Sequence, residues 1–349
     1  MLKNDLSQPN THKVTQLFND IRGLIDQARN DVARAVNVTL VLLNWHIGQR
    51  IHQEILGKER ADYGKYIVEK ISEQLLNQYG KGFSRTNLFH MVRFVQYFPD
   101  LRTIQTLSGQ LSWSHFVELI YLEDPLKREF YAELCRIERW GVRVLKAKIE
   151  SMTYERTHIA KRPDHQIRQD LKSLRETGTM TPDLVFRDPY TLEFLDLEDP
   201  YKERDFETAI LKSMEKFLLE LGSDFAFLAR QKRITIDGQD YYLDLLFFHR
   251  RLRCPIVIEL KMGRFKAADK GQMELYLRWI EKYEQNPGEN PPIGIILCSE
   301  KSTEHVELLQ LEQSGIRIAQ FLTELPPKEI FQNQLHQSIA RAREKFKSP

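Results

Sequence analysis

Residues Gln231 to Lys261 read QKRITIDGQDYYLDLLFFHRRLRCPIVIELK, and this stretch decides the fold of the C-terminal half of the chain. Asp237-Gly238 is a dipeptide that favours a tight two-residue hairpin turn. The residues before the turn alternate between polar and apolar, and those after it are almost continuously apolar. A further apolar run follows a short basic turn. The pattern predicts three consecutive strands, over residues 231–236, 239–248 and 256–261.

Charged residues interrupt two of these strands. Aspartate is depleted from strands, so Asp244 in the middle of an apolar run loses hydration unless a cation or several donors compensate it. Because side chains alternate along a strand, Glu259 and Lys261 point to one face of the third strand. If the second and third strands are neighbours, two carboxylates and an ammonium lie close together.

Such a group of side chains suits phosphodiester hydrolysis assisted by a hard divalent cation. Asp244 and Glu259 would supply oxygen ligands to Mg²⁺ or Mn²⁺, and the cation would activate a bound water. Lys261 would orient that water or stabilise negative charge on the phosphate. The alternative is structural: Glu259 and Lys261 form an exposed ion pair of little energetic value, and Asp244 is satisfied by backbone donors at a bulge.

The composition is that of an ordinary globular protein. The chain has 349 residues, of which 42% are hydrophobic and 29% charged, and its formal net charge is +2. This length suffices for two domains, each with its own core. Because so small a net charge gives no global basic field, an argument for nucleic-acid binding depends on local clusters.

Several classes of protein are disfavoured by the sequence. No apolar run approaches the ~20 residues of a membrane span, and the first residues, MLKNDLSQPNTHK, are too polar for a secretory signal. Cys135, Cys254 and Cys298 are far apart and form no C-x-x-C pair, so we expect neither a disulfide framework nor a zinc site. We therefore expect a cytoplasmic protein that does not enter the membrane.

Helical spacing of apolar residues predicts an all-α domain over residues 1–152, beginning with two helices or one long bent helix over residues 14–55. A helix over residues 63–79, a glycine turn and a helix capped by Ser84 are similar to a helix-turn-helix. In that arrangement the second helix reads DNA, through Arg85, Asn87, His90 and Arg93. Glycine-linked helix pairs are also common in helical domains that bind no DNA.

The remainder of the chain predicts a charged connector over residues 153–182 and a second domain over residues 183–349. A short helix over residues 166–176 is compatible with the connector. In the second domain the strands predict a mixed sheet with helices on both faces. The remaining elements that we expect are helices over residues 205–221, 267–283 and 303–313 and strands over residues 293–298 and 316–321.

Asp244 and the tripeptide Glu259-Leu260-Lys261 are similar to the metal-binding aspartate and the (D/E)-X-K element of PD-(D/E)XK nucleases. Longer stretches of the sequence resemble the bacterial YhcG-like family of nuclease-domain proteins. Among them are FLLELGSDFAFLARQKRI, NPPIGIILC, NWHIGQRI, YGKYIVEKISEQL, GKGFSRTNL and LSWSHFVEL. The resemblance covers nearly the whole chain. It implies an α+β protein of two domains, an all-α N-terminal domain and a C-terminal restriction-endonuclease-like domain with a central mixed sheet flanked by helices.

The resemblance also implies roles for individual residues. Glu207 matches the acidic residue of the first helix, Asp244 and Glu259 the metal ligands, and Lys261 the catalytic lysine. Gln272 and Tyr276 match the glutamine and tyrosine that follow E-X-K in several nuclease branches and line the DNA side, and Gln231 is expected to face the same site. The chain departs from the family name in having no proline before Asp244.

Basic residues crowd the two ends of the predicted hairpin: Arg230, Lys232, Arg233, Arg250, Arg251 and Arg253. They would neutralise phosphates and position a duplex without reading its sequence, or they would protect the edge of the sheet from pairing. The expectation is thus a Mg²⁺- or Mn²⁺-dependent endonuclease acting on DNA in restriction-like defence, recombination or repair. The alternatives are RNA as the substrate and a non-catalytic nucleic-acid-binding or scaffold protein. Concerted cleavage of both strands would require two copies, and a homodimer provides them.

Overall fold

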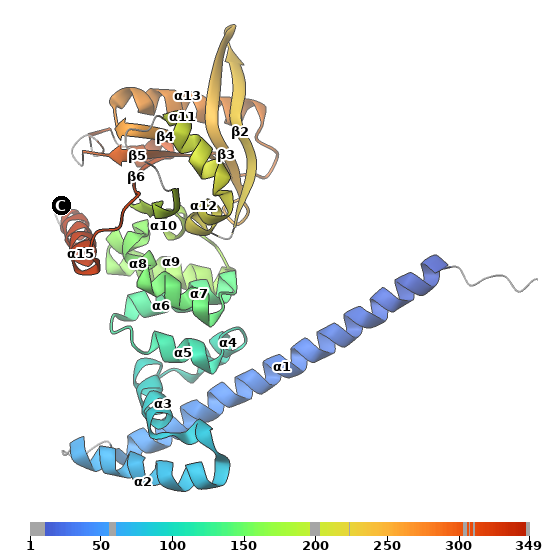
Figure 1. Ribbon diagram of the computed structural model, residues 1–349, viewed down its shortest axis with the longest axis vertical. Helices are drawn as coiled ribbons and strands as arrows, with labels where there is room; N and C mark the ends of the chain where they lie inside the picture. The colour runs from blue at the N-terminus through green and yellow to red at the C-terminus, as the bar shows by residue number, and fades with distance from the viewer. Residues whose placement is uncertain are drawn as a thin grey trace, which may run out of the picture. The chain divides into compact units, whose positions relative to one another are not determined.

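The computed structural model describes residues 11–55, 61–195, 203–222, 224–302, 306, 308–309 and 311–346, and of residues 11–14, 61–63, 203–205 and 312 it describes the backbone alone. The chain divides into two compact units, Met1–Lys146 and Ala147–Pro349. Figure 1 shows the helices and strands of both units. No helix in the described part of the chain is long and apolar enough to cross a membrane.

The first unit is helical, as expected. Its residues 11–55 form one helix, α1, rather than two. Ser84 caps α3 by accepting the backbone N–H of Asn87 at 3.4 Å, and Gly80 before it has a positive φ of 83°. The elements are α1 (Thr11–Ile55), α2 (Ala61–Tyr79), η1 (Lys81–Phe83), α3 (Arg85–Tyr97), α4 (Leu101–Ser108), α5 (Trp113–Leu119), α6 (Pro125–Glu138) and the start of α7 (Val142–Glu150).

The second unit is built on a six-stranded mixed sheet of order β1-β6-β5-β4-β3-β2. Strands β2, β3 and β4 form an antiparallel meander, whereas β4, β5, β6 and β1 run parallel to one another. The three strands predicted from the opening stretch are therefore neighbours. The strands are β1 (Tyr190–Thr191), β2 (Phe225–Ile236), β3 (Gln239–His249), β4 (Cys254–Arg264), β5 (Ile293–Glu300) and β6 (Ile316–Leu322).

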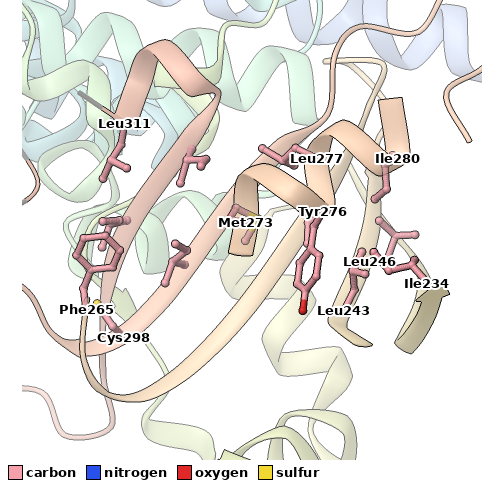
Figure 2. Packing of buried hydrophobic residues seen from close by; sticks show 14 residues of the cluster. Ile234, Leu243, Leu246, Phe265, Met273, Tyr276, Leu277, Ile280, Cys298 and Leu311 are labelled. Carbon is pink, nitrogen blue, oxygen red and sulfur yellow. The ribbon is translucent and has the colours of Figure 1, made fainter. Parts of the chain in front are cut away.

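Helices cover both faces of this sheet. Leu246 belongs to a buried cluster that includes Met273 and Leu277 of α13 (Ala267–Tyr283), and Figure 2 shows this cluster. The next residue, Phe247, points to the opposite face and packs on Phe217 of α12 (Met214–Leu221), with ring centroids 6.1 Å apart. The arrangement confirms the α+β fold expected from the sequence, with a mixed sheet flanked by helices.

One expectation about helices is corrected. The helix expected over residues 205–221 is broken at Ser213 into α11 (Glu203–Lys212) and α12. Within residues 153–182, the helix expected over residues 166–176 is present as part of α9 (Asp164–Thr177), and its Ile167, Leu171 and Leu174 are buried in the second unit. Domain boundaries at residues 152 and 182 stay a prediction. The elements of this region are α8 (Thr153–Arg156), η2 (His158–Lys161), α9 (Asp164–Thr177) and α10 (Pro182–Val185).

Some elements were not predicted. Their apolar patterns are weak or short. These elements are β1, η3 (Glu193–Leu195), η4 (Leu311–Ser314) and the C-terminal helix α15 (Lys328–Lys345). Phe331 and Leu335 of α15 pack against Met152, so this helix belongs to the core of the second unit. The helix expected over residues 303–313 lies mostly outside the described residues.

Candidate active site

The site begins where strands β3 and β4 separate. Their pairing runs from His249–Cys254 to Leu245–Ile258 and includes no residue beyond. Asp244 is the next residue of β3, and its Oδ2 accepts the backbone N–H of Leu260 at 2.9 Å. A carboxylate thus holds the two strands together at the point where their ladder ends, and it remains half-buried.

Strand β2 brings Gln231 opposite Asp244, between the pairs Arg230–Leu245 and Lys232–Leu243. The register follows from the two-residue turn, in which Asp237 and Gly238 both have positive φ, 49° and 79°. Gln231 itself has a φ of 42°, a left-handed conformation that is uncommon for a residue with a side chain.

The side chains of both strands change face at this pair. Ala229 and Ile234 of β2 contact the same core cluster, although they are five positions apart and a regular strand would place them on opposite faces. The same holds for Leu246 and Leu243 of β3. The left-handed backbone at Gln231 accounts for the change in β2.

The amide of Gln231 joins two carboxylates. Its Nε2 donates to Oδ1 of Asp244 at 2.9 Å and to Oε2 of Glu207 in α11, also at 2.9 Å. A primary amide has two N–H donors, so it can satisfy both acceptors at once. Glu207 is thereby held close to Asp244, and its role in catalysis stays a prediction.

Glu259 and Lys261 point to the α13 face of β4 and form a largely buried pair. Lys261 Nζ lies 3.0 Å from Oε1 of Glu259, and the side chains are 19% and 6% exposed. Gln272 of α13 donates to the same oxygen at 3.1 Å. This geometry differs from the exposed ion pair of the structural alternative, because a buried carboxylate must be compensated by nearby donors or cations.

Tyr276 orients Gln272. Its hydroxyl lies 2.6 Å from Gln272 Nε2 and donates to the backbone carbonyl of Tyr242 at 3.2 Å. The ring is buried in the cluster of Figure 2 beside Leu243. Burial raises the pKa of the Tyr276 phenol above its ordinary value, and the carboxylate of Glu259 raises it further. The hydroxyl is therefore protonated and available as a donor at neutral pH.

Backbone groups complete the site. The N–H of Leu260 and the carbonyl of Tyr242 fix Asp244 and Tyr276, and sequence reasoning missed both. Every residue except proline carries both groups, so no side-chain signal could have identified these two positions.

The donor set fits a hard cation. Asp244 and Glu259 offer carboxylate oxygens only, and Mg²⁺ is commonly held by one or two carboxylates together with waters and substrate phosphates. Among the residues that the structure describes, no group of three or more His, Cys, Asp or Glu side chains is close enough to hold a metal ion.

The basic residues form two groups rather than one rim. Arg230, Lys232 and Arg233 flank Gln231 on β2; Lys232 pairs with Glu284 at 2.7 Å and Arg233 with Asp240 at 3.4 Å.

The other group, Arg250, Arg251 and Arg253, lies at the turn between β3 and β4. Arg250 is six residues from Asp244, which is roughly 20 Å along a strand. Arg251 pairs with Asp224 at 2.5 Å. The first group therefore adjoins the carboxylates, and the second does not.

The residues expected to read DNA lie in the first unit and bind other parts of that unit. Asn87 donates to Gly82 O at 2.5 Å and accepts from Trp113 Nε1 at 2.8 Å. Arg85 pairs with Glu69 at 3.2 Å. Arg93 donates to Ile120 O at 2.7 Å, and its guanidinium lies over the rings of Tyr97 and Tyr121; His90 is 2.9 Å from the Tyr121 hydroxyl. Their assignment to DNA binding stays a prediction.

Comparison with known proteins identifies relatives of both parts of the chain. Residues 183–336 match the YhcG PDDEXK nuclease domain, and residues 20–156 match the DUF1016 N-terminal domain. The chain is 34% identical to "Putative nuclease YhcG" of Escherichia coli (strain K12), over 98% of this chain and 99% of that protein.

Solved structures match the chain in part. A repair endonuclease from Pyrococcus abyssi is 23% identical, with a TM-score of 0.25 over 38% of this chain. EndoMS, solved as a complex named EndoMS-dsDNA2, is 19% identical, with a TM-score of 0.27 over 37% of this chain. The chain spans about half the length of these structures, 50% and 51%.

Proposed function

Because the chain belongs to the YhcG family of PD-(D/E)XK nuclease-domain proteins, we propose that it is a metal-dependent nuclease that hydrolyses phosphodiester bonds of DNA. The observation that carries the proposal is the convergence of Asp244, Glu259 and Lys261 where β3 and β4 separate. A half-buried and a buried carboxylate, with an ammonium beside Glu259, would form a site for a divalent cation and a phosphate.

Asp244 and Glu259 would hold Mg²⁺ or Mn²⁺. When bound, the cation polarises the phosphoryl group and lowers the pKa of a coordinated water. Gln231 fixes Asp244 through one oxygen and Leu260 N–H fixes it through the other, so the carboxylate is oriented before a ligand arrives. Such prior orientation reduces the reorganisation that binding requires.

Lys261 would act on the phosphate. An ammonium has three N–H donors, and the contact with Glu259 Oε1 occupies one of them. In the proposed mechanism this ammonium would donate to a water or to a phosphate oxygen, where negative charge increases in the transition state. Gln272 donates to the same oxygen of Glu259 and is itself held by the Tyr276 hydroxyl.

The substrate is DNA in this proposal, and the basic group Arg230, Lys232 and Arg233 would contact its phosphates. They are neighbours of Gln231 on β2, and in this proposal their cationic side chains would meet the phosphates that flank the scissile bond. Phosphate contacts of this kind position a duplex without selecting its sequence. The same chemistry would serve restriction-like defence and recombination or repair.

The test is cleavage by the full-length chain. Supercoiled, linear, branched and single-stranded DNA and an RNA duplex of matched sequence are each incubated with Mg²⁺ or Mn²⁺ and with EDTA. We expect metal-dependent cleavage of DNA that Glu259→Gln abolishes. Equal cleavage by wild type and Glu259→Gln would indicate a contaminant. If neither cleaves, and DNA binding is steeply salt-dependent and unchanged in Lys261→Ala, the chain is a non-catalytic binding protein.

A further inference from the structure

The N-terminal half of α1 carries a long apolar surface that none of the described residues buries. Every residue from 15 to 36 is exposed. The most exposed apolar side chains are Leu24 at 67%, Val32 at 65% and Phe18 at 62%. Further along α1, the helix contacts its own unit: the guanidinium of Arg34 lies against Gly109, and Asn37 donates to Ser108 O at 2.7 Å. Contiguous apolar surface of this size on a protein indicates an interaction site.

The apolar residues form one stripe along the helix. Its members recur three, four or seven positions apart, as the residues on one side of a helix do. They are Leu17, Phe18, Ile21, Leu24, Ile25, Ala28, Val32, Ala35 and Val36. At 100° per residue they cover about 120° of the helix circumference, which is the width of a helix face that packs on another helix.

This segment is a poor candidate for an isolated helix. It contains Gly23, Asn19 and Asn30, which disfavour helix, and none of the described residues packs on its apolar side chains. Helices of this length are marginal in water, and in proteins most of their stability comes from packing an apolar face. The helical state of residues 15–36 therefore implies a partner for the stripe.

We propose that the stripe pairs with the same stripe of a second copy of this chain, in parallel orientation. Seven large apolar side chains, each 47–67% exposed, offer roughly 700 Å² per copy, close to the ~800 Å² per partner of a standard stable interface. A self-associating surface needs no other protein to be present.

The charges beside the stripe determine the orientation. Arg22 and Arg29 border one edge, and Asp20 and Asp31 border the other. In a parallel pair of helices the two different edges face each other, as positions e and g do in a coiled coil. Asp20 then meets Arg22 of the second copy, and Asp31 meets Arg29. An antiparallel pair would bring arginine against arginine and aspartate against aspartate, which is unfavourable.

The first test is the oligomeric state of the full-length chain by sedimentation equilibrium. We expect a concentration-dependent dimer. Leu24→Asp should raise its Kd at least ~100-fold, because two leucines, one from each copy, leave the interface. Asn30→Asp adds the same charge on the polar face and should leave the dimer intact. Both positions lie outside the packed part of the unit, so circular dichroism should report the remaining helices unchanged in both variants.

The second test fixes the orientation by cross-linking. Ala35→Cys lies within the stripe and Ala33→Cys on the opposite face, and both alanines are exposed. Under mild oxidation the Ala35→Cys chain should form a disulfide-linked dimer and the Ala33→Cys chain should not. Cys135, Cys254 and Cys298 are buried and do not compete. A monomeric wild type, or a dimer that Leu24→Asp leaves unchanged, overturns the proposal; a dimer without the Ala35→Cys cross-link overturns the parallel orientation.

Discussion

Gln231 combines a strained backbone with two carboxylate contacts. A residue with a side chain at a φ of 42° costs on the order of 1–3 kcal/mol, and such strain is found at functional sites. In return, its amide orients Glu207 and Asp244. The strained backbone at Gln231 therefore lowers the free energy of unfolding, while its side chain fixes the geometry of the site.

The variant Gln231→Gly separates the effect of this residue on stability from its effect on cleavage. Glycine adopts a positive φ without strain, so the free energy of unfolding should rise by about 1 kcal/mol, whereas cleavage should fall ~10–100-fold because two carboxylates lose their shared donor. Gln239→Gly is the control: Gln239 lies in β3 without a positive φ, so the same substitution should destabilise by about 0.5–1 kcal/mol and spare activity. Unchanged cleavage in Gln231→Gly would remove this residue from the site.

Tyr276→Phe removes one hydroxyl and keeps the packed ring. Gln272 would lose the acceptor that orients it toward Glu259, so cleavage should fall by ~10-fold. The free energy of unfolding should fall by about 1–2 kcal/mol, because two hydrogen bonds of the hydroxyl, to the carbonyl of Tyr242 and from Gln272, are lost. Denaturant titration and cleavage rates of the same preparations measure both quantities. An activity equal to that of wild type would assign Tyr276 to the core alone.

The side chains of the candidate site could be predicted, but their connections could not. Asp244, Glu259 and Lys261 are visible in the sequence because charged residues are rare in buried strands. The bridging role of Gln231 is not visible, because it depends on a backbone conformation and on a helix 24 residues away.

At the scale of elements, the turn between β3 and β4 contains a pH-sensitive contact. His249 is 3% exposed, and its Nδ1 accepts the backbone N–H of Leu252 at 3.0 Å. Burial lowers the pKa of His249 to about 4, with Arg251 lowering it and Asp224 opposing the change. The imidazole is thus neutral in the folded protein at pH values where an unfolded chain would already bind a proton.

The sign of the pH effect follows. The folded pKa lies below the ordinary value of 6.5, so the stabilising contribution is complete above pH 6.5 and is lost as the pH falls toward 4. The loss is at most about 3 kcal/mol. Thermal or denaturant unfolding of wild type and His249→Gln between pH 7 and pH 4 should show a smaller decrease in the variant. Parallel decreases in both proteins would contradict this assignment.

Secondary structure was predictable where apolar spacing was clear. The meander, α13 and the two parallel strands β5 and β6 follow from such patterns. The break of the predicted helix at Ser213 did not, because its apolar spacing continues across the break. Helix α9 was only partly expected, since Ile167, Leu171 and Leu174 have helical spacing but lie among charged residues.

At the scale of the whole molecule, each of the two units has its own core, and the candidate site lies entirely in the second. All of its residues belong to residues 147–349: Glu207, Gln231, Asp244, Glu259, Lys261, Gln272 and Tyr276. Fold class could be predicted because helical and strand patterns occupy different halves of the chain. The partner of the α1 stripe could not, since an apolar helical pattern is the same whether its face packs within the chain or on another copy.

The central claim is that Asp244 belongs to a metal-dependent nuclease site. Its most direct test is the single-turnover rate of DNA cleavage with Mg²⁺ for wild type, Asp244→Asn and Asp240→Asn, with enzyme in excess. Asp240 is an exposed carboxylate of the same strand that binds Thr235 and Arg233. We predict a loss of at least ~100-fold for Asp244→Asn and a rate within about twofold of wild type for Asp240→Asn. Equal rates for Asp244→Asn and wild type would contradict the claim.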